Sequence, residues 1–236
     1  MSTTKAAGLH ERVLARLGPA IVSGAVPEGS VLRIEQIGEE HGVSRTVARD
    51  VVKVLESLQV VTSRRRVGVT IRPRTEWNLF DPRLIRWRLA GPDRERQLRS
   101  LGELRRAVEP VAAALAAGHA DADQCVRLAT AATGMAVSGR ASDLEAYLVH
   151  DVAFHQVLLQ ASGNEMFAAL ASVVGEVLTG RTEHHLMPAT PEPAAIRLHA
   201  DVAAAVAGRD PAAAERSMRA LLDEATQAIE AALPRP

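Results

Sequence analysis

The segment Gly42-Val43-Ser44-Arg45-Thr46-Val47-Ala48-Arg49-Asp50 decides the fold of the first third of the chain. Ser44 stands where a helix N-cap is expected, and apolar residues recur at helical spacing after it. Arg45 and Arg49 are four residues apart, so they share one face of that helix. An arginine fork fits the O6 and N7 atoms of guanine, while Ser44 and Thr46 can donate to phosphates. The segment predicts the recognition helix of a helix-turn-helix; a solvated helix with two surface arginines is the alternative.

The flanking sequence supplies the remaining elements of a winged helix-turn-helix. Apolar spacing predicts helices over 9–22 and 34–41, before the recognition helix. After it, two β-prone runs at 60–62 and 69–71 enclose a hairpin tip at 63–68. Three helices followed by a hairpin within about 65 residues is the order of that fold.

Three adjacent arginines occupy the predicted hairpin tip: Arg64, Arg65 and Arg66. Three neighbouring cations repel one another, so contact with phosphates or the minor groove explains them better than a structural role does. A solvated turn is the alternative. The predicted DNA contacts are Arg33, Ser44, Arg45, Thr46, Arg49, Arg64, Arg65, Arg66 and Gly68.

Charge is distributed unevenly in a chain whose net charge is zero. Residues 1–74 contain 12 Lys/Arg against 7 Asp/Glu, whereas the remaining 162 residues contain 16 against 21. A basic first third suggests an anionic partner at that end. One cysteine, no apolar leader and no long uncharged apolar run predict a cytoplasmic protein with no membrane partner.

The rest of the chain predicts helices only, so the fold class is mainly α. A linker over 73–82 precedes helices near 82–89, 94–118, 121–137, 141–161, 164–182, 192–208 and 210–232. The predicted domains are a DNA-binding domain (1–74), a linker with a docking helix (75–93) and an antiparallel helical bundle for effector binding and dimerisation (94–236).

A metal site is suggested by Asp151 and His155, four residues apart on one helix, and by His199 on a later helix. One carboxylate and two imidazoles suit Zn, Ni or Mn, with coordination positions left open. Spacing alone leaves open a surface pair with no metal, because eight histidines are scattered along this chain.

Residues 9–72 resemble the N-terminal domain of GntR-type regulators. The matching motifs are Ile21-Val22-Ser23-Gly24, Pro27-Glu28-Gly29-Ser30-Val31-Leu32, Gly42-Val43-Ser44-Arg45-Thr46 with Arg49, and Leu55-Glu56. Gln36 stands where that family often has a DNA-contacting arginine, and Arg66 where the wing often has its first glycine. These departures concern the operator sequence rather than DNA binding itself.

Residues 98–232 resemble the FCD effector domain of the FadR subfamily. The matching motifs are Leu101-Gly102-Glu103-Leu104-Arg105 with Val108-Glu109-Pro110, Asp151-x-x-Phe154-His155, Ser162-Gly163-Asn164, and His199 with Gly208-Arg209-Asp210. The resemblance implies a divalent metal bound by Asp151, His155 and His199. Leu221 stands where a further histidine is usual, so we expect either a three-ligand site or no metal. His184 or His185 could replace the missing ligand.

The same resemblance implies that Arg105 binds the carboxylate of an organic acid. The alternative is a structural ion pair with Glu103 or Glu109. Asn164 is expected either to line the effector cavity or to cap the next helix. Residues 77–87 resemble the linker of regulators that respond to sugar acids such as galactonate.

Together these features predict a homodimeric repressor that binds an inverted-repeat, double-stranded DNA operator and responds to a small carboxylate effector. The alternatives are a metal-sensing repressor, a purely structural metal, and a small metalloenzyme. An enzyme is not expected, because H-E-x-x-H is absent and the arginines of the first third would have no role.

Overall fold

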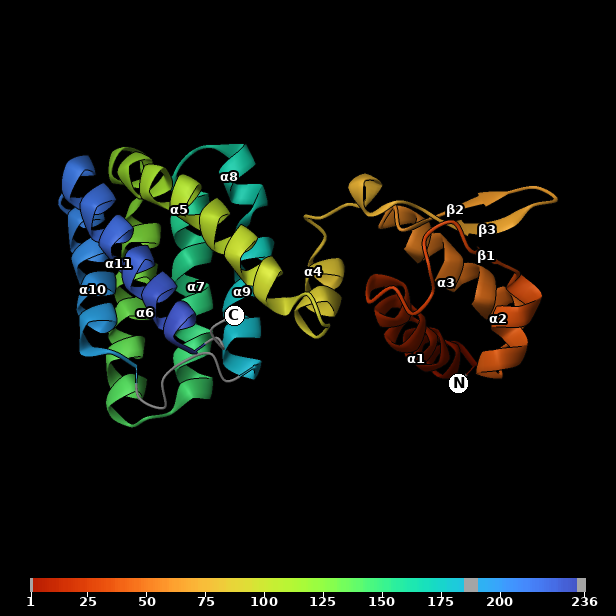
Figure 1. The fold of residues 1–236 in the computed structure, drawn as a ribbon. Helices are drawn as coiled ribbons and strands as arrows, with labels where there is room; N and C mark the ends of the chain where they lie inside the picture. Colours follow the sequence, from red (N-terminus) through yellow and green to blue (C-terminus); the bar gives the residue numbers. More distant parts are fainter. Residues whose placement is uncertain (1, 185–190, 233–236) are drawn as a thin grey trace. The chain divides into compact units, whose positions relative to one another are not determined.

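The computed structural model describes residues 2–184 and 191–232, and it divides the chain into two compact units, Met1–Arg94 and Glu95–Pro236 (Figure 1). The segment 75–93, expected to be a separate linker, therefore falls inside the first unit. None of the helices in the described ranges is long and apolar enough to cross a membrane.

The first unit has three helices and a small sheet in the predicted order, followed by a fourth helix. Its elements are α1 (Ser2–Val22), β1 (Val31–Leu32), α2 (Ile34–His41), α3 (Arg45–Ser57), β2 (Val61–Arg64), β3 (Gly68–Ile71), the 3-10 turn η1 (Arg74–Glu76) and α4 (Pro82–Leu89). The predicted winged helix-turn-helix is confirmed. Two boundaries differ from expectation: α1 begins at Ser2 rather than near Leu9, and β1 was not predicted because a two-residue strand has no readable alternation.

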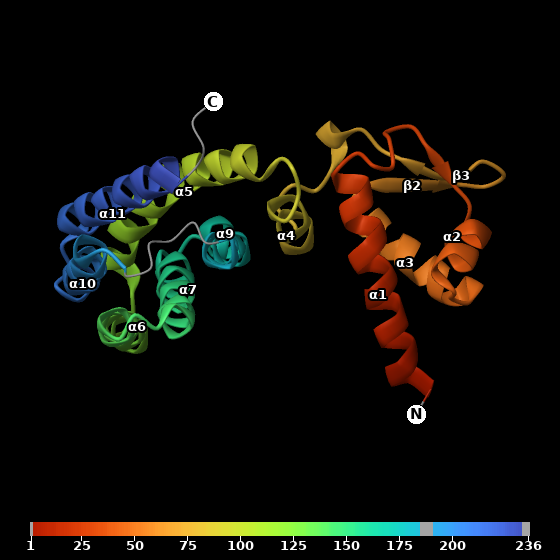
Figure 2. The same cartoon turned by 60° about the horizontal axis from the view of Figure 1, so that its bottom comes forward.

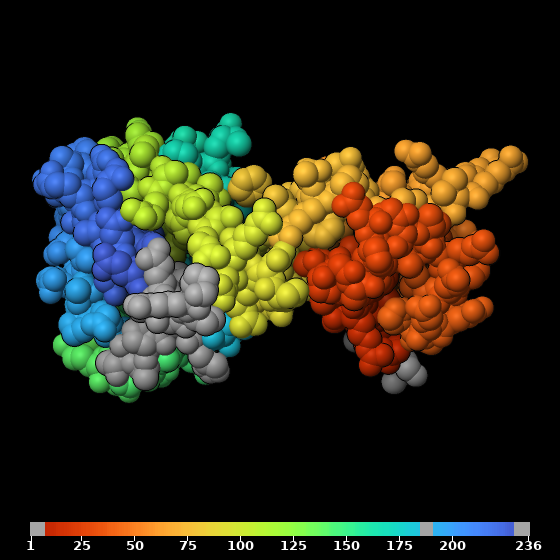
Figure 3. All heavy atoms as spheres, in the orientation of Figure 1, coloured from red at the N-terminus to blue at the C-terminus, as the bar shows by residue number. Residues whose placement is uncertain are grey.

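The sheet is antiparallel with the strand order β1-β3-β2. Val61 faces Ile71, Arg64 faces Gly68, and Val31 faces Thr70. Figure 3 shows the β2–β3 tip as a protrusion from the surface of this unit. The hairpin therefore carries its tip residues away from the core.

The recognition helix α3 is fixed at its start by a cap and along its length by burial. The Ser44 Oγ accepts a hydrogen bond from the Val47 N–H, which supplies one of the partners that a helix start lacks. Gly42 adopts a left-handed φ of 62°, which makes the tight turn after α2. The buried side of α3 consists of Ala48, Val51, Val52 and Leu55. That burial leaves the opposite face, with both arginines, in solvent.

Helix α4 belongs to the core of the first unit through Leu84 and Trp87. The Trp87 ring lies directly over Gly18 of α1, since a Cβ placed on Gly18 would come within 2.4 Å of it. Glycine at position 18 is thus required by close packing rather than by backbone conformation.

Gly18→Ala should destabilise the first unit by about 1–3 kcal/mol, because the added methyl overpacks the Trp87 contact. Gly8→Ala on the same helix is the matched control, since a Cβ there meets nothing within 4 Å and alanine favours helix. Thermal unfolding of the two variants checks this. A Gly18→Ala protein as stable as Gly8→Ala would contradict the packing.

The second unit contains helices and no strand among its described residues, as predicted. They are α5 (Arg94–His119), α6 (Ala122–Arg140), α7 (Leu144–Ala161), α8 (Glu165–Ala169), α9 (Ala171–Glu183), α10 (Pro193–Ala207) and α11 (Pro211–Ala232). Figure 2 shows α6, α7, α9 and α10 running side by side, with α5 and α11 laid across them. The core between the helices is built largely from Ala, Val and Leu, which replace the scarce aromatic residues.

One helix prediction was wrong. The single helix expected over 164–182 is two helices, α8 and α9, separated at Leu170. The Leu170 N–H donates to the Phe167 carbonyl, one residue short of the α-helical spacing, so the chain tightens there. Phe167 and Val174 consequently pack against the same cluster of buried residues.

Candidate functional site

The exposed face of α3 forms the candidate DNA interface. Arg45, Thr46 and Arg49 are all exposed there, as the sequence predicts for residues that read DNA. An ion pair of 2.9 Å joins the Arg45 Nη2 to the Glu35 Oε1 on α2, with both side chains more than half exposed. Such a pair contributes little stability in water, so Arg45 can exchange Glu35 for a base edge at small cost.

The wing presents Arg64, Arg65 and Arg66 to solvent at its tip. Arg66 adopts a left-handed φ of 68°, a conformation that favours glycine. Gly68 has a structural reason to be glycine, because a Cβ would lie 2.8 Å from the Leu32 carbonyl oxygen. Its role as a DNA contact stays a prediction.

Arg33 is exposed at the N-cap of α2. Its backbone N–H donates to the Gln36 Oε1 at 3.2 Å, so the Gln36 side chain supplies an acceptor at the start of α2. A capped α2 places Gln36 in a helix-stabilising role in the DNA-free protein.

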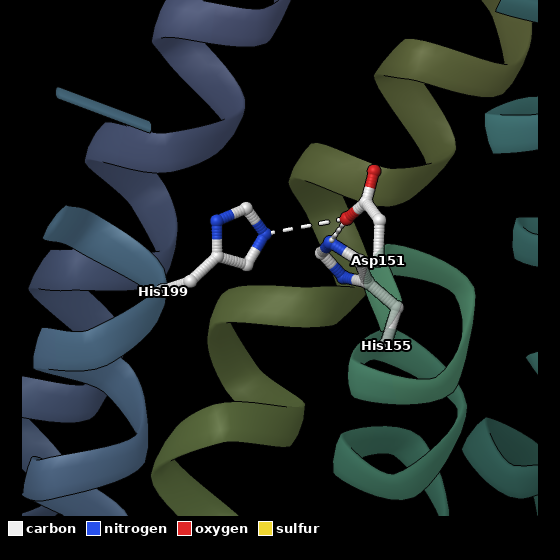
Figure 4. A group of neighbouring side chains, drawn as sticks. All are labelled: Asp151, His155 and His199. Carbon is white, nitrogen blue, oxygen red and sulfur yellow. Dashed lines mark ion pairs between the residues drawn. The ribbon is translucent and has the colours of Figure 1, made fainter. Parts of the chain in front are cut away.

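The predicted metal ligands meet inside the second unit. Asp151 and His155 come from α7 and His199 from α10, and all three side chains are buried (Figure 4). The Asp151 Oδ1 lies 3.3 Å from the Nε2 of each histidine, and the possible ligand atoms all lie within 4.8 Å of one another. Ligand atoms around a tetrahedral zinc are separated by about 3.3 Å, given bonds of about 2.0 Å.

The outer nitrogens of both imidazoles have acceptors, which fix their orientation. The His199 Nδ1 donates to the Ala195 carbonyl at 2.8 Å, and the His155 Nδ1 lies 2.6 Å from the Glu109 Oε2. With its Nδ1 proton assigned, a neutral His199 presents its Nε2 lone pair toward the Asp151 carboxylate, whereas the His155 Nε2 also lies 3.3 Å from the Arg105 Nη2. Metal-bound histidines have this arrangement, with a carbonyl or carboxylate behind the ring.

Two buried atoms of this cluster have no hydrogen-bond partner among the described residues: the Asp151 Oδ1 and the His199 Nε2. Facing lone pairs cannot satisfy each other, and burial without a partner costs free energy. A divalent cation between them would satisfy both atoms. The donor set and the two unsatisfied atoms therefore fit a metal.

The carboxylates of the cluster are ionised. Burial favours the neutral acid, but the contact with His155 holds the pKa of Asp151 well below its usual range. For Glu109, Arg105 and His155 likewise overcome burial and lower the pKa to about 2. A metal would thus bind the charged carboxylate of Asp151, and the charged carboxylate of Glu109 would lie behind His155.

A cavity of about 30 Å³ opens beside the cluster, enough for one or two water molecules. Its wall is formed by side chains from α5, α7, α9, α10 and α11, among them Arg105, Tyr147, Arg181, Glu192, Leu221 and Glu224. Leu221 therefore lies at the site. The resemblance implied a further histidine at this position, and this chain has leucine there. Neither of the two histidines proposed as replacements is seen to supply that ligand. His184 does not line this cavity, and His185 lies outside the described residues.

Arg105 reaches the cavity, but its charge is already paired. Its Nε donates to the Glu109 Oε1 at 2.6 Å, and its Nη2 lies 3.3 Å from the His155 Nε2. The ion pair that the sequence left as an alternative is present, with Glu109 rather than Glu103. Asn164 caps a helix and does not line this cavity: its Oδ1 accepts a hydrogen bond from the Met166 N–H at the start of α8.

Several residues of the site were not singled out from the sequence as site residues, among them Tyr147, Glu109 and Arg181. Tyr147 precedes Asp151 by four residues on α7, and Glu109 follows Arg105 by four on α5, so helical spacing could have found both. Arg181 lies on α9, and no spacing relates it to the other helices.

Comparisons with known proteins agree with this architecture. The model of bacterial regulatory proteins of the gntR family matches residues 9–71, and the FCD domain model matches residues 100–224. The galactonate operon transcriptional repressor of Escherichia coli is 26% identical over 93% of this chain and 96% of its own. The uncharacterised HTH-type regulator YieP of Escherichia coli is 30% identical over 69% of this chain and 71% of its own.

Among solved structures, a GntR protein of Streptococcus agalactiae covers 95% of this chain and 100% of its own with a TM-score of 0.52. At 22% sequence identity, that likeness concerns the fold alone. The matched family and the named relatives are transcriptional regulators, which argues against the metalloenzyme alternative. With a winged helix-turn-helix followed by an FCD domain, this chain belongs to the GntR family of bacterial transcriptional regulators.

Proposed function

We propose that this protein is a homodimeric transcriptional repressor whose affinity for an inverted-repeat operator is controlled by a small organic acid bound beside a divalent metal. The observation that carries the proposal is the buried Asp151, His155 and His199 cluster, with two unsatisfied atoms, next to a cavity. As a regulator of bacterial genes, it would act in the cytoplasm.

The metal is supported by the chemistry of its ligands. Two imidazoles and a carboxylate suit Zn, Ni or Mn, and three protein ligands leave coordination positions open. When bound, the metal would supply a Lewis-acid partner for oxygen atoms of a ligand. Glu109 and Ala195 would hold the two histidines in orientation through their Nδ1 atoms.

The acid is supported by the relative named a galactonate operon repressor and by the two arginines in the cavity wall. A cavity of about 30 Å³ is too small for a sugar acid, so binding must displace the wall. Helix α5 contributes Arg105 to that wall and begins at Arg94, the last residue of the first unit. A shift of α5 would thus reach the junction between the units.

Dimerisation is proposed because a single winged module neutralises few phosphates. Two modules double the contacts and require two half-sites, related as an inverted repeat. The helices of the second unit supply the proposed interface. Repression then requires that the acid bind the DNA-free arrangement more tightly than the DNA-bound one.

The experiment is an operator-binding titration of the full chain, on an inverted repeat obtained by selection from genomic fragments. The zinc-loaded and chelated proteins are compared with and without D-galactonate. The proposal expects release of DNA only when metal and acid are both present. Release by zinc alone would favour the metal-sensing alternative, and a chelated protein that unfolds would favour a structural metal.

Leu221→His is expected to raise zinc affinity by at least about tenfold, because it offers the cavity a fourth ligand in place of an apolar side chain. The same change should weaken the response to acid, since one open position is filled. Competition with a zinc-binding dye measures the first effect. An unchanged zinc affinity would mean that position 221 does not reach the metal.

A further inference from the structure

Arg181 is a buried cation without a partner in the described part of the chain. Only 5% of it is exposed, and it forms part of the cavity wall together with Asp151, His155 and His199. Its Nε is buried and has no hydrogen-bond partner, and no ion pair joins its guanidinium to a described residue. An isolated buried charge is unfavourable unless something compensates it.

The contrast with Arg105 shows how unusual this environment is. Arg105 is as buried as Arg181, but Glu109 lies 2.6 Å from its Nε. Burial and the positive charge of Arg105 lower the pKa of Arg181 despite the negative charges of Asp151 and Glu224, whereas Glu109 outweighs burial and raises the pKa of Arg105. Of the two guanidinium groups in the cavity wall, Arg181 is therefore the one with binding capacity left over.

The other acidic residues of the cavity wall limit the negative charge that a ligand can carry. Glu192 is exposed and Glu224 partly buried, and both line the same cavity. Neither forms an ion pair with Arg181 in the described structure. Their carboxylates would repel a second anionic group on the ligand but can accept hydrogen bonds from hydroxyls.

We propose that Arg181, rather than Arg105, binds the carboxylate of the effector, and that Glu192 and Glu224 restrict the effector to hydroxylated monocarboxylates. This inference rests on the proposed function, because it assigns the acid-binding group within the same site. A guanidinium fork binds a carboxylate through two parallel hydrogen bonds, which would compensate the buried charge.

The test compares Arg181→Gln with Arg197→Gln, which removes an exposed arginine from α10. Calorimetric titrations use the zinc-loaded full chain with D-galactonate, its dicarboxylate galactarate and the neutral galactitol. Arg181→Gln should weaken galactonate binding by about 10- to 100-fold, while zinc content and operator binding without acid stay unchanged. Arg197→Gln should bind like the wild type. Galactarate should bind more weakly than galactonate, and galactitol should show no binding.

Thermal unfolding without acid separates binding from a structural role. Removing an uncompensated buried charge should leave the melting temperature of Arg181→Gln unchanged or raise it. A lower melting temperature, or galactonate affinity equal to the wild type, would overturn the assignment. Arg181→Lys keeps the charge without the fork, so its galactonate affinity must also fall, or the assignment is overturned.

The remaining outcomes separate the two proposals. A wild type that binds none of the acids would overturn both the effector class and the role of Arg181. Acid binding that depends on Arg181 but leaves operator affinity unchanged would support the Arg181 assignment and contradict only the proposed function. Tighter binding of galactarate than of galactonate would overturn the part assigned to Glu192 and Glu224.

Discussion

Arg45→Ala is expected to weaken operator binding by about 30- to 20,000-fold. A bidentate contact between arginine and guanine contributes about 1–3 kcal/mol, and the proposed homodimer would lose it at both half-sites. The exposed position of Arg45 at the start of α3, held only by a surface ion pair with Glu35, supports this role. Fluorescence anisotropy with a labelled operator at fixed salt measures the effect.

Arg127→Ala is the matched control for charge, since it removes an exposed arginine from α6 in the second unit. Arg45→Ala should also lose discrimination between operator and unrelated DNA, because base contacts carry sequence information and phosphate contacts do not. Equal operator affinities for the two variants would contradict the assignment of α3 as the recognition helix.

The second large effect concerns metal content. His155→Ala should lose nearly all of the bound divalent metal, because it removes a ligand and leaves two donors from separate helices. His150→Ala, on the same helix α7, should keep about one metal per chain, since His150 packs against Gly134 and lies outside the cluster. Elemental analysis after dialysis gives the stoichiometry. Equal metal content in the two variants would place the metal elsewhere in the chain.

The first unit could be predicted from the sequence almost completely, because its signals are local. The Ser44 cap, the apolar face of α3 and the turn residues of the hairpin all lie within a few residues of what they determine. The exceptions have nonlocal causes. Strand β1 exists because Val31 pairs with Thr70, and α4 joins the first unit because Trp87 lies over Gly18.

In the second unit, spacing placed Asp151 and His155 on one face, but it could not show that His199 points at them from another helix. The side chains around the three possible metal ligands were harder to predict. Whether Arg105 faces Glu103 or Glu109 depends on which face of α5 is buried, and the chain buries Glu109. Arg181 is brought to the cavity by the packing of α9 against α7, which no local pattern encodes.

In the proposed mechanism, an acid bound at the Asp151, His155 and His199 cluster controls how tightly the first unit holds DNA. The operator dissociation constant of the zinc-loaded wild type and of Asp151→Asn, each with and without saturating D-galactonate, tests this control. Galactonate is expected to weaken wild-type binding at least about tenfold, the size of a typical coupling free energy, and to leave the operator affinity of Asp151→Asn unchanged. An equal shift in both proteins, or none in the wild type with any hydroxylated monocarboxylate, would contradict the proposed mechanism.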